Sequence, residues 1–110
     1  MTVDVGAQLR KGVVEYCILG LLSAEPTYGW QLSEALVSRG LIASIGTLYP
    51  ILSRLRTQGL VSGFDRHSDA GPSRRYYRVT EIGHLQLAAF REQWGPFART
   101  VQELVGEDTP

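Results

Sequence analysis

The chain has 110 residues and a mass of 12.2 kDa, with 44% hydrophobic and 20% charged residues, which fits one globular domain and excludes native disorder. A single cysteine excludes an intramolecular disulfide framework, and the two histidines have no cysteine partners at zinc-ligand spacing. No stretch has the pattern of a membrane span or a signal peptide, so we expect a cytoplasmic protein with no metal and no cofactor.

The formal net charge is zero, but the charges are unevenly distributed along the chain. Residues 1–38 carry two basic and four acidic side chains, residues 39–78 carry seven arginines and two aspartates, and residues 79–110 carry two arginines and five acids. The middle of the chain therefore has a net charge of +5, all of it from arginine, whose guanidinium group matches phosphate oxygens and guanine edges. This pattern indicates nucleic acid as a partner, although an ordinary solvated surface gives the same count.

Two helices are expected before residue 41. Apolar residues recur with helical spacing from Leu9 to Ser23, and Pro26 ends that helix because proline disfavours a helical residue before it. Thr27 can cap a second helix, which ends at Gly40.

A third helix is expected from Ile45 to Gln58, with Ser44 as its cap and Gly59 as its stop. Its apolar residues cover one side, and the opposite side is small, polar and basic. That exposed side presents Gly46, Thr47, Pro50, Ser53, Arg54 and Thr57.

The periodicity then changes to that of a hairpin and returns to that of a helix. Residues 60–64 and 74–79 are rich in strand formers, residues 67–73 favour a turn, and Thr80 can cap a last helix. This order predicts an α+β, mostly α, winged helix-turn-helix fold with one C-terminal dimerisation helix. We expect residues 1–79 to form the winged-helix DNA-binding domain and residues 80–110 the dimerisation helix, together one compact unit.

The last helix carries a heptad pattern that suits a partner helix. The predicted seam consists of Leu87, Phe90, Trp94, Phe97, Val101 and Leu104. An adjacent strip, Ile82, Leu85 and Ala89, is expected to cover the domain's own core, and a single wide core face is the alternative. Gly95-Pro96 is expected to kink or break this helix.

Several motifs are similar to those of the PadR family of bacterial transcriptional regulators. These are Gly46-Thr-Leu-Tyr-Pro50, Gly59-Leu-Val61, and Gly71-Pro72 followed by Arg74-Arg-Tyr-Tyr-Arg-Val-Thr80 and Gly83. The resemblance covers nearly the whole chain, and the length matches a short-tailed branch that includes LmrR-like multidrug sensors. It implies a homodimeric repressor that reads a pseudo-palindromic operator, with residues 44–58 as the recognition helix and residues 71–75 in the wing.

The DNA-binding candidates combine the exposed side of the third helix with the base of the hairpin. They are Tyr28, Ser44, Gly46, Thr47, Tyr49, Pro50, Ser53, Arg54, Arg74, Arg75 and Tyr76. For Pro50 the alternative is a role in local shape. Strand alternation puts Arg74 and Arg75 on opposite faces, so one of them can pair with Asp65 or Glu81, and one of Tyr76 and Tyr77 is expected in the core.

The short-tailed branch also implies a planar aromatic small-molecule effector bound between protomers. The matching positions are Gly12 and Tyr16 on the first helix and Trp94 and Phe97 on the last, with interface packing as the alternative for Trp94. No catalytic motif is found, so an enzyme is not expected. The competing function is a winged-helix protein-interaction module without DNA binding.

Overall fold

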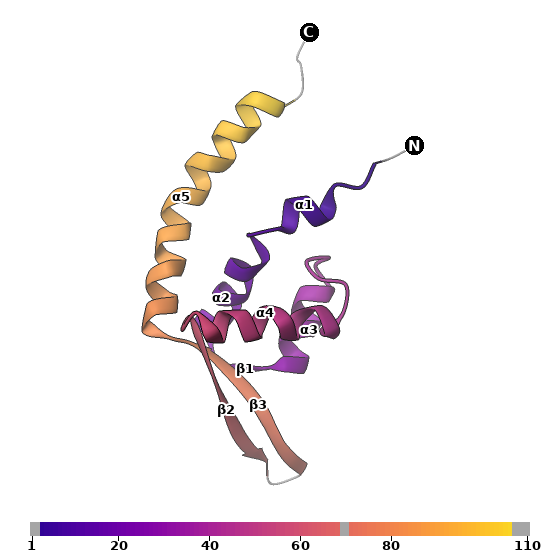
Figure 1. The fold of residues 1–110 in the computed structure, drawn as a ribbon, viewed down its shortest axis with the longest axis vertical. Coiled ribbons are helices and arrows are strands. Elements are labelled where there is room, and N and C mark those ends of the chain that lie inside the picture. Colours follow the sequence, from indigo (N-terminus) through magenta and orange to yellow (C-terminus); the bar gives the residue numbers. More distant parts are fainter. Residues whose placement is uncertain (1–2, 69–70, 107–110) are drawn as a thin grey trace.

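The computed structural model describes residues 3–68 and 71–106. In chain order these residues form α1 (Gly6–Arg10), α2 (Val14–Ala24), β1 (Thr27–Tyr28), α3 (Gly29–Val37), α4 (Ile45–Thr57), β2 (Val61–Ser68), β3 (Gly71–Val79) and α5 (Glu81–Val105). Helices α2, α3 and α4 form a small bundle, the β2–β3 hairpin projects from one side of it, and α5 projects from the other (Figure 1). This is the predicted winged helix-turn-helix order.

One apolar core holds the bundle together. Its fully buried side chains come from α2, α3 and α4, and they are Ile18, Leu19, Leu22, Leu32, Leu36, Leu48, Leu52 and Leu55. Burial of an aliphatic side chain of this size contributes roughly 1.5–3 kcal/mol each, so the bundle fixes how α4 is presented.

The expected first helix is divided in two, which corrects the prediction of one helix from Leu9 to Ser23. Helix α1 ends at Arg10 and α2 begins at Val14, because Gly12 between them has a φ of 80°. That left-handed backbone costs an L side chain energy but is open to glycine. Gly12 therefore lies in a connection and not on a helix.

The sheet contains a strand that the sequence did not predict. Thr27 and Tyr28 form β1 and pair with Tyr77 and Tyr76, which gives the antiparallel order β1-β3-β2. Thr27 is thus a strand residue, and Tyr28 occupies the N-cap position of α3. The hairpin strands are longer than expected, and residues 69–70 of the predicted turn lie outside the described residues.

The middle helices end slightly before the predicted residues. Helix α3 ends at Val37 and not at Gly40, and α4 ends at Thr57, one residue before Gln58. Gly40 and Gly59 have positive φ in the turns that follow, as expected of residues that stop a helix. Ser44 takes the N-cap position of α4 in an extended conformation, although its side chain makes no capping bond.

Helix α5 begins where the sequence places it. The Thr80 hydroxyl accepts a hydrogen bond from the Gly83 amide at 3.0 Å and donates one to the Gly59 carbonyl at 2.6 Å. Gly83 lies so close to the start of β2 that an added Cβ would be 2.1 Å from the Leu60 carbonyl oxygen. The first turn of α5 is therefore pressed against the sheet.

Helix α5 does not break at Pro96, so of the two expected outcomes, a kink or a break, the break is wrong. It is one bowed helix of 25 residues (Figure 1). Pro96 removes the amide that would bond the Glu92 carbonyl, but both residues are exposed, so water can satisfy that carbonyl.

The inner face of α5 also differs from the prediction. Gly83 and Leu87 are buried, whereas Ile82, Leu85 and Ala89 of the expected core strip are exposed. Leu87, at 3% exposure, belongs to the chain's own core and not to an open seam. The tight approach at Gly83 sets this rotation of the helix.

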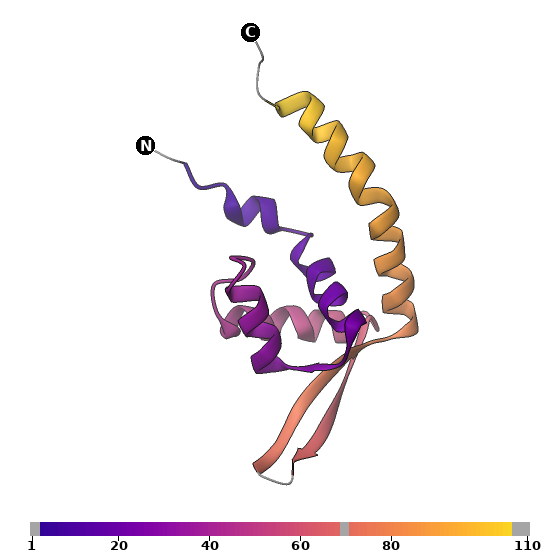
Figure 2. The ribbon, with the colours of Figure 1, turned by 180° about the vertical axis from the view of Figure 1, so that it is seen from behind.

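The outer half of α5 stands clear of the bundle, which makes the chain elongated (Figure 2). The extents are 63 × 35 × 21 Å, and the radius of gyration is 16.5 Å, against about 13 Å for a compact domain of 100 residues. The first and last described residues both lie on the side away from the hairpin tip. None of the helices in residues 3–68 and 71–106 combines the length and hydropathy that crossing a bilayer requires.

Candidate nucleic-acid interface

Helix α4 presents a low, small-residue surface away from the core. Leu48, Leu52 and Leu55 are buried beneath it, and the predicted DNA-binding residues on its far side are all exposed. The centre of that surface consists of Gly46, Pro50, Ser53 and Thr57. None of them is bulky or charged, so a flat partner can approach the helix backbone closely.

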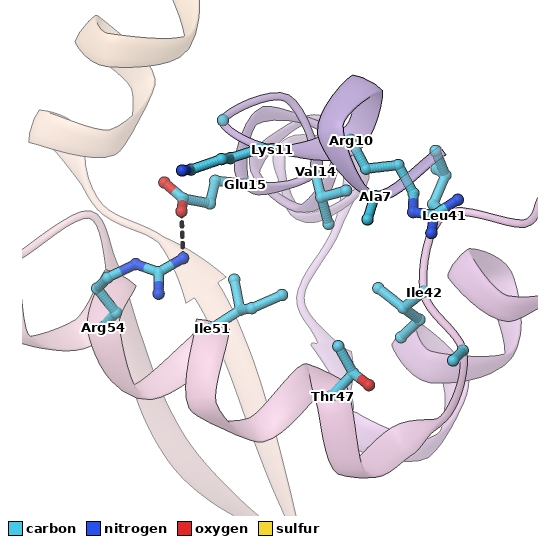
Figure 3. A pocket seen from close by; sticks show the side chains of 12 residues that line it. Ala7, Arg10, Lys11, Val14, Glu15, Leu41, Ile42, Thr47, Ile51 and Arg54 are labelled. Carbon is cyan, nitrogen blue, oxygen red and sulfur yellow. Dashed lines mark hydrogen bonds and ion pairs between the residues drawn. The ribbon is translucent and has the colours of Figure 1, made fainter. Parts of the chain in front are cut away.

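Arg54 lies on the flank of α4 that faces α2. Its guanidinium forms an ion pair with the Glu15 carboxylate of α2 (Figure 3). Both side chains keep contact with water, so the pair is worth at most about 1 kcal/mol. The weak ion pair with Glu15 therefore orients the exposed Arg54 side chain toward α2. The sequence alone did not suggest this pair.

Tyr49 lies on the opposite flank of α4, where it approaches the N-terminus of α3. An added Cβ on Gly29 would be 2.9 Å from the Tyr49 hydroxyl, and the ring remains about half exposed. Tyr28, the N-cap residue of α3, directly precedes Gly29 in the chain. Both tyrosines thus frame a helix N-terminus, where backbone amides favour an anion.

The hairpin places Arg74 and Arg75 on opposite faces, as strand alternation requires. Arg75 pairs with Asp65 at 3.5 Å across the hairpin, one of the two predicted options. The Arg74 guanidinium lies 4.8 Å from the centre of the Tyr28 ring. Tyr77 is buried and Tyr76 only partly so, which agrees with one tyrosine in the core.

Two further arginines on the hairpin were not among the predicted residues. Arg66 lies 4.2 Å from the Tyr76 ring centre, and Arg78 lies 4.2 Å from that of Phe64. Arg66 and Arg74 are directly opposite each other in the strand register. Each guanidinium packs against a different tyrosine ring, Tyr76 for Arg66 and Tyr28 for Arg74, which reduces the repulsion between the two charges. The basic composition of residues 39–78 could have pointed to these two arginines, but only the structure shows which aromatic rings their guanidinium groups contact.

Three of the four effector candidates form part of an aromatic ladder. Tyr16 stacks on Phe90 at 4.2 Å with planes 12° apart, Phe90 lies 5.5 Å from Trp94, and Trp94 lies 6.3 Å from Phe97. Tyr16 also accepts a hydrogen bond from the Gln86 amide at 3.4 Å. The ladder is more exposed at its far end, with Trp94 43% and Phe97 62% exposed.

Gly12 is not part of this ladder, which corrects its placement beside Tyr16 on one helix. It lines a different hollow, between the α1–α2 connection and α4.

The predicted heptad seam is only partly available to a partner helix. Leu87 is buried within the chain, and Phe90 is half-buried against Tyr16. The outer positions of the seam remain exposed, and they are Trp94, Phe97, Val101 and Leu104.

A helix-turn-helix whose second helix is exposed, followed by an arginine-rich hairpin, defines a winged-helix regulator of transcription. Comparison with known proteins gives the family. Residues 18–89 match the model of the transcriptional regulator PadR-like family, and the chain belongs to that family. It is therefore a transcriptional regulator and not an enzyme.

Individual relatives cover almost the same length. A PadR-like transcriptional regulator from Bacillus cereus strain ATCC 14579 is 39% identical, with a TM-score of 0.81 over 92% of this chain and 99% of its own. A PadR family regulator from Eggerthella lenta DSM 2243 is 31% identical, with a TM-score of 0.79 over 93% and 89% of the two chains. A transcriptional regulator of Mycobacterium tuberculosis is 34% identical over 86% of this chain and 87% of its own. The narrower likeness to LmrR-like sensors stays a prediction.

Proposed function

We propose that the chain is a homodimeric repressor that binds a pseudo-palindromic DNA operator and is released by a planar aromatic effector. The observation that carries DNA binding is the small-residue surface of α4 next to an arginine-rich hairpin, in a chain whose net charge is zero. An α-helix with such a surface fits the major groove, and basic side chains at its edge hold phosphates. A protein that acts on DNA would work in the cytoplasm of a bacterium, as expected above.

In this proposal the residues divide by role. Gly46, Pro50 and Ser53 allow close approach, Thr47 and Arg54 reach base edges, and Tyr49 and Tyr28 hold a phosphate at the N-terminus of α3. Ser44, Arg74, Arg75 and Tyr76 complete the backbone contacts. Arg54 must exchange Glu15 for DNA, and Arg75 must exchange Asp65, so both contacts are made at the expense of weak ion pairs.

Dimerisation is proposed through the outer half of α5. A helix that projects with Phe97, Val101 and Leu104 40–81% exposed leaves an apolar surface that monomers seldom keep. A two-fold axis through such a seam would place two α4 helices on one side of the dimer, as a palindromic operator requires. The winged domain, residues 1–79, and this helix, residues 80–110, would then act as one unit.

Effector binding is proposed at the exposed end of the aromatic ladder. Trp94 and Phe97 offer flat rings that can stack on a planar ligand, while Tyr16 is already stacked on Phe90. A ligand between protomers would favour one arrangement of the dimer and so change the separation of the two α4 helices.

DNA binding is tested by fluorescence anisotropy with fragments of the gene's own promoter, at several salt concentrations. Arg54→Ala should lose about 1–3 kcal/mol of binding and relax specificity at one base pair, because a bidentate base contact is removed. Arg75→Ala should weaken binding to all sequences and reduce the slope of log affinity against log salt by about one.

The matched control is Arg99→Ala on α5, which removes the same charge far from α4 and the hairpin. If all three variants bind the promoter as tightly as the parent, these side chains are not the DNA contacts. If the parent binds no promoter fragment, the protein-interaction module is the better explanation.

A further inference from the structure

We propose that Glu15 exchanges partners when the protein binds DNA, pairing with Arg54 in the free protein and with Lys11 in the complex. Glu15 thereby limits how tightly Arg54 holds DNA, and Lys11 lowers the cost of releasing Arg54. This role of Glu15 rests on the proposed function, in which Arg54 contacts DNA. The three side chains come from separate parts of the chain, Lys11 from the α1–α2 connection, Glu15 from α2 and Arg54 from α4 (Figure 3).

Glu15 lies between two cations. Its carboxylate accepts a hydrogen bond from the Arg54 guanidinium, and the Lys11 side chain lies beside it as well (Figure 3). Within residues 3–68 and 71–106 the ion pair of Glu15 is with Arg54 alone, so the Lys11 ammonium group is still available to pair with it. The Glu15 side chain is 26% exposed, against 50% for Arg54, and a partly buried carboxylate needs a counter-charge more than a hydrated one does.

Arg54 has two uses that compete with each other. Glu15 draws the guanidinium toward α2, whereas the base edges of a bound duplex would lie over the exposed surface of α4, around Pro50 and Ser53. A guanidinium that binds guanine with two donors must turn one of its edges toward the base. The phosphates of the duplex also repel the carboxylate that lies beside it. Glu15 therefore competes with DNA for Arg54 within the molecule.

Lys11 is placed to take over Glu15. Release of Arg54 without a replacement would leave a partly buried carboxylate unpaired next to a polyanion. Gly12, with a φ of 80°, forms the turn between Lys11 and α2, and the Lys11 side chain extends alongside Glu15 (Figure 3). Because a lysine side chain is flexible and its ammonium group has three donors, a change of rotamer is enough to form the new pair. Glu15 then has one ion pair both before and after DNA binds.

The exchange adjusts DNA affinity and does not block binding. An ion pair between partly exposed groups is weak, so its loss lowers DNA affinity by only about two- to fivefold. Glu15 therefore sets how much protein is needed to occupy the operator.

The test is a double-mutant cycle on promoter binding by the whole protein, measured by fluorescence anisotropy at about 0.15 M salt, where charges are screened within about 8 Å. Glu15→Gln should tighten binding by about two- to fivefold in the parent and by less than about 1.5-fold in Arg54→Ala. The matched control is Glu34→Gln on α3, which removes the same charge from a residue that has no ion pair in the described part of the chain. It should leave binding unchanged. An equal gain in Arg54→Ala, or from Glu34→Gln, would show general charge repulsion and overturn the proposal.

A second cycle tests Lys11. Lys11→Gln should weaken binding by about two- to fivefold in the parent and leave it unchanged in Glu15→Gln, because Lys11 acts through Glu15. Lys11→Arg should bind DNA as the parent does. A loss that persists in Glu15→Gln, with the salt slope reduced by about one, would make Lys11 a phosphate contact and overturn its part in the exchange.

Side-chain NMR follows the exchange independently of affinity. The Arg54 Nε–Hε signal of the free protein should move in Glu15→Gln. The Lys11 Nζ signal should move when the parent binds DNA and stay in place when Glu15→Gln does. An Arg54 signal that is the same in the parent and in Glu15→Gln would refute the pair in the free protein.

Failure of the proposed function gives a different result from failure of the exchange. If the parent binds no promoter fragment, or if Arg54→Ala binds as tightly as the parent, the proposed DNA contact is wrong and the exchange falls with it. If Arg54→Ala weakens binding and Glu15→Gln leaves it unchanged, the DNA contact stands and only the exchange is refuted.

Discussion

Gly83→Ala tests whether the close approach of α5 to the sheet sets the position of α5. The added Cβ would be 2.1 Å from the Leu60 carbonyl oxygen and 2.6 Å from Val79 Cγ2. An ordinary carbon–oxygen contact is about 3.3 Å, so the first turn of α5 must retreat by about 1.2 Å. The obstacle is backbone, and it cannot rotate away as a long side chain can.

The free energy of unfolding should fall by about 2–4 kcal/mol. Overpacking costs typically 1–3 kcal/mol, and the retreat strains the Thr80 hydroxyl bond to Gly59 and the Thr80 amide bond to Leu60, worth about 1 kcal/mol each. Alanine has a higher helix propensity than glycine, which offsets about 1 kcal/mol of this loss. For a domain of this size the melting temperature should drop by roughly 8–15 °C.

Urea and thermal unfolding provide the measurement, at two protein concentrations because the melting temperature of a dimer depends on concentration. Gly20→Ala is the matched control, since its Cβ would meet no described atom within 4 Å and it also lies inside a helix. It should stabilise the protein by about 0.5–1 kcal/mol. If Gly83→Ala unfolds within about 0.5 kcal/mol of the parent, the close approach does not hold α5 in place.

Three further predictions concern the outer helix, the aromatic ladder and the thiol. Phe97→Glu should give a monomer with unchanged helix content, because this ring is exposed in the single chain; sedimentation and circular dichroism check it, and a dimer would refute the seam. Planar aromatic cations should quench tryptophan fluorescence in the parent and not in Trp94→Ala, in which Trp30 is the remaining emitter. Equal quenching in the parent and in Trp94→Ala would show that Trp94 does not bind the ligand and only packs at the interface. Burial raises the pKa of the Cys17 thiol, so less thiolate exists at neutral pH, and alkylation by iodoacetamide should be slower than for a free cysteine until the pH passes the usual thiol range.

The sequence predicted those features that depend on local chemistry. The Thr80 cap, the stops at Gly40 and Gly59, and the exposed side of α4 all follow from residue type and spacing within one or two turns. The split at Gly12 was missed because glycine within a periodic pattern reads equally well as a helical residue. Helix α5 continues through Pro96 because an exposed helix can bend and expose one carbonyl to water.

Features that depend on distant contacts were beyond local reasoning. The strand at Thr27 exists only because β3 lies beside it, and Glu15 meets Arg54 across 39 residues of chain. The burial of Leu87 in place of Ile82 and Leu85 follows from the rotation that Gly83 permits. Of the candidate site, the exposed helix surface was therefore predictable, whereas the partners that hold its arginines were not.

Both ends of the described chain lie away from the hairpin tip, on the side of the projecting half of α5 (Figure 1). A purification tag or fluorescent protein attached at either end would therefore leave the hairpin unobstructed. It would lie near the exposed rings of α5 instead, the surface proposed for dimerisation. The oligomeric state of a fusion protein that fails to bind DNA would therefore be the first property to measure.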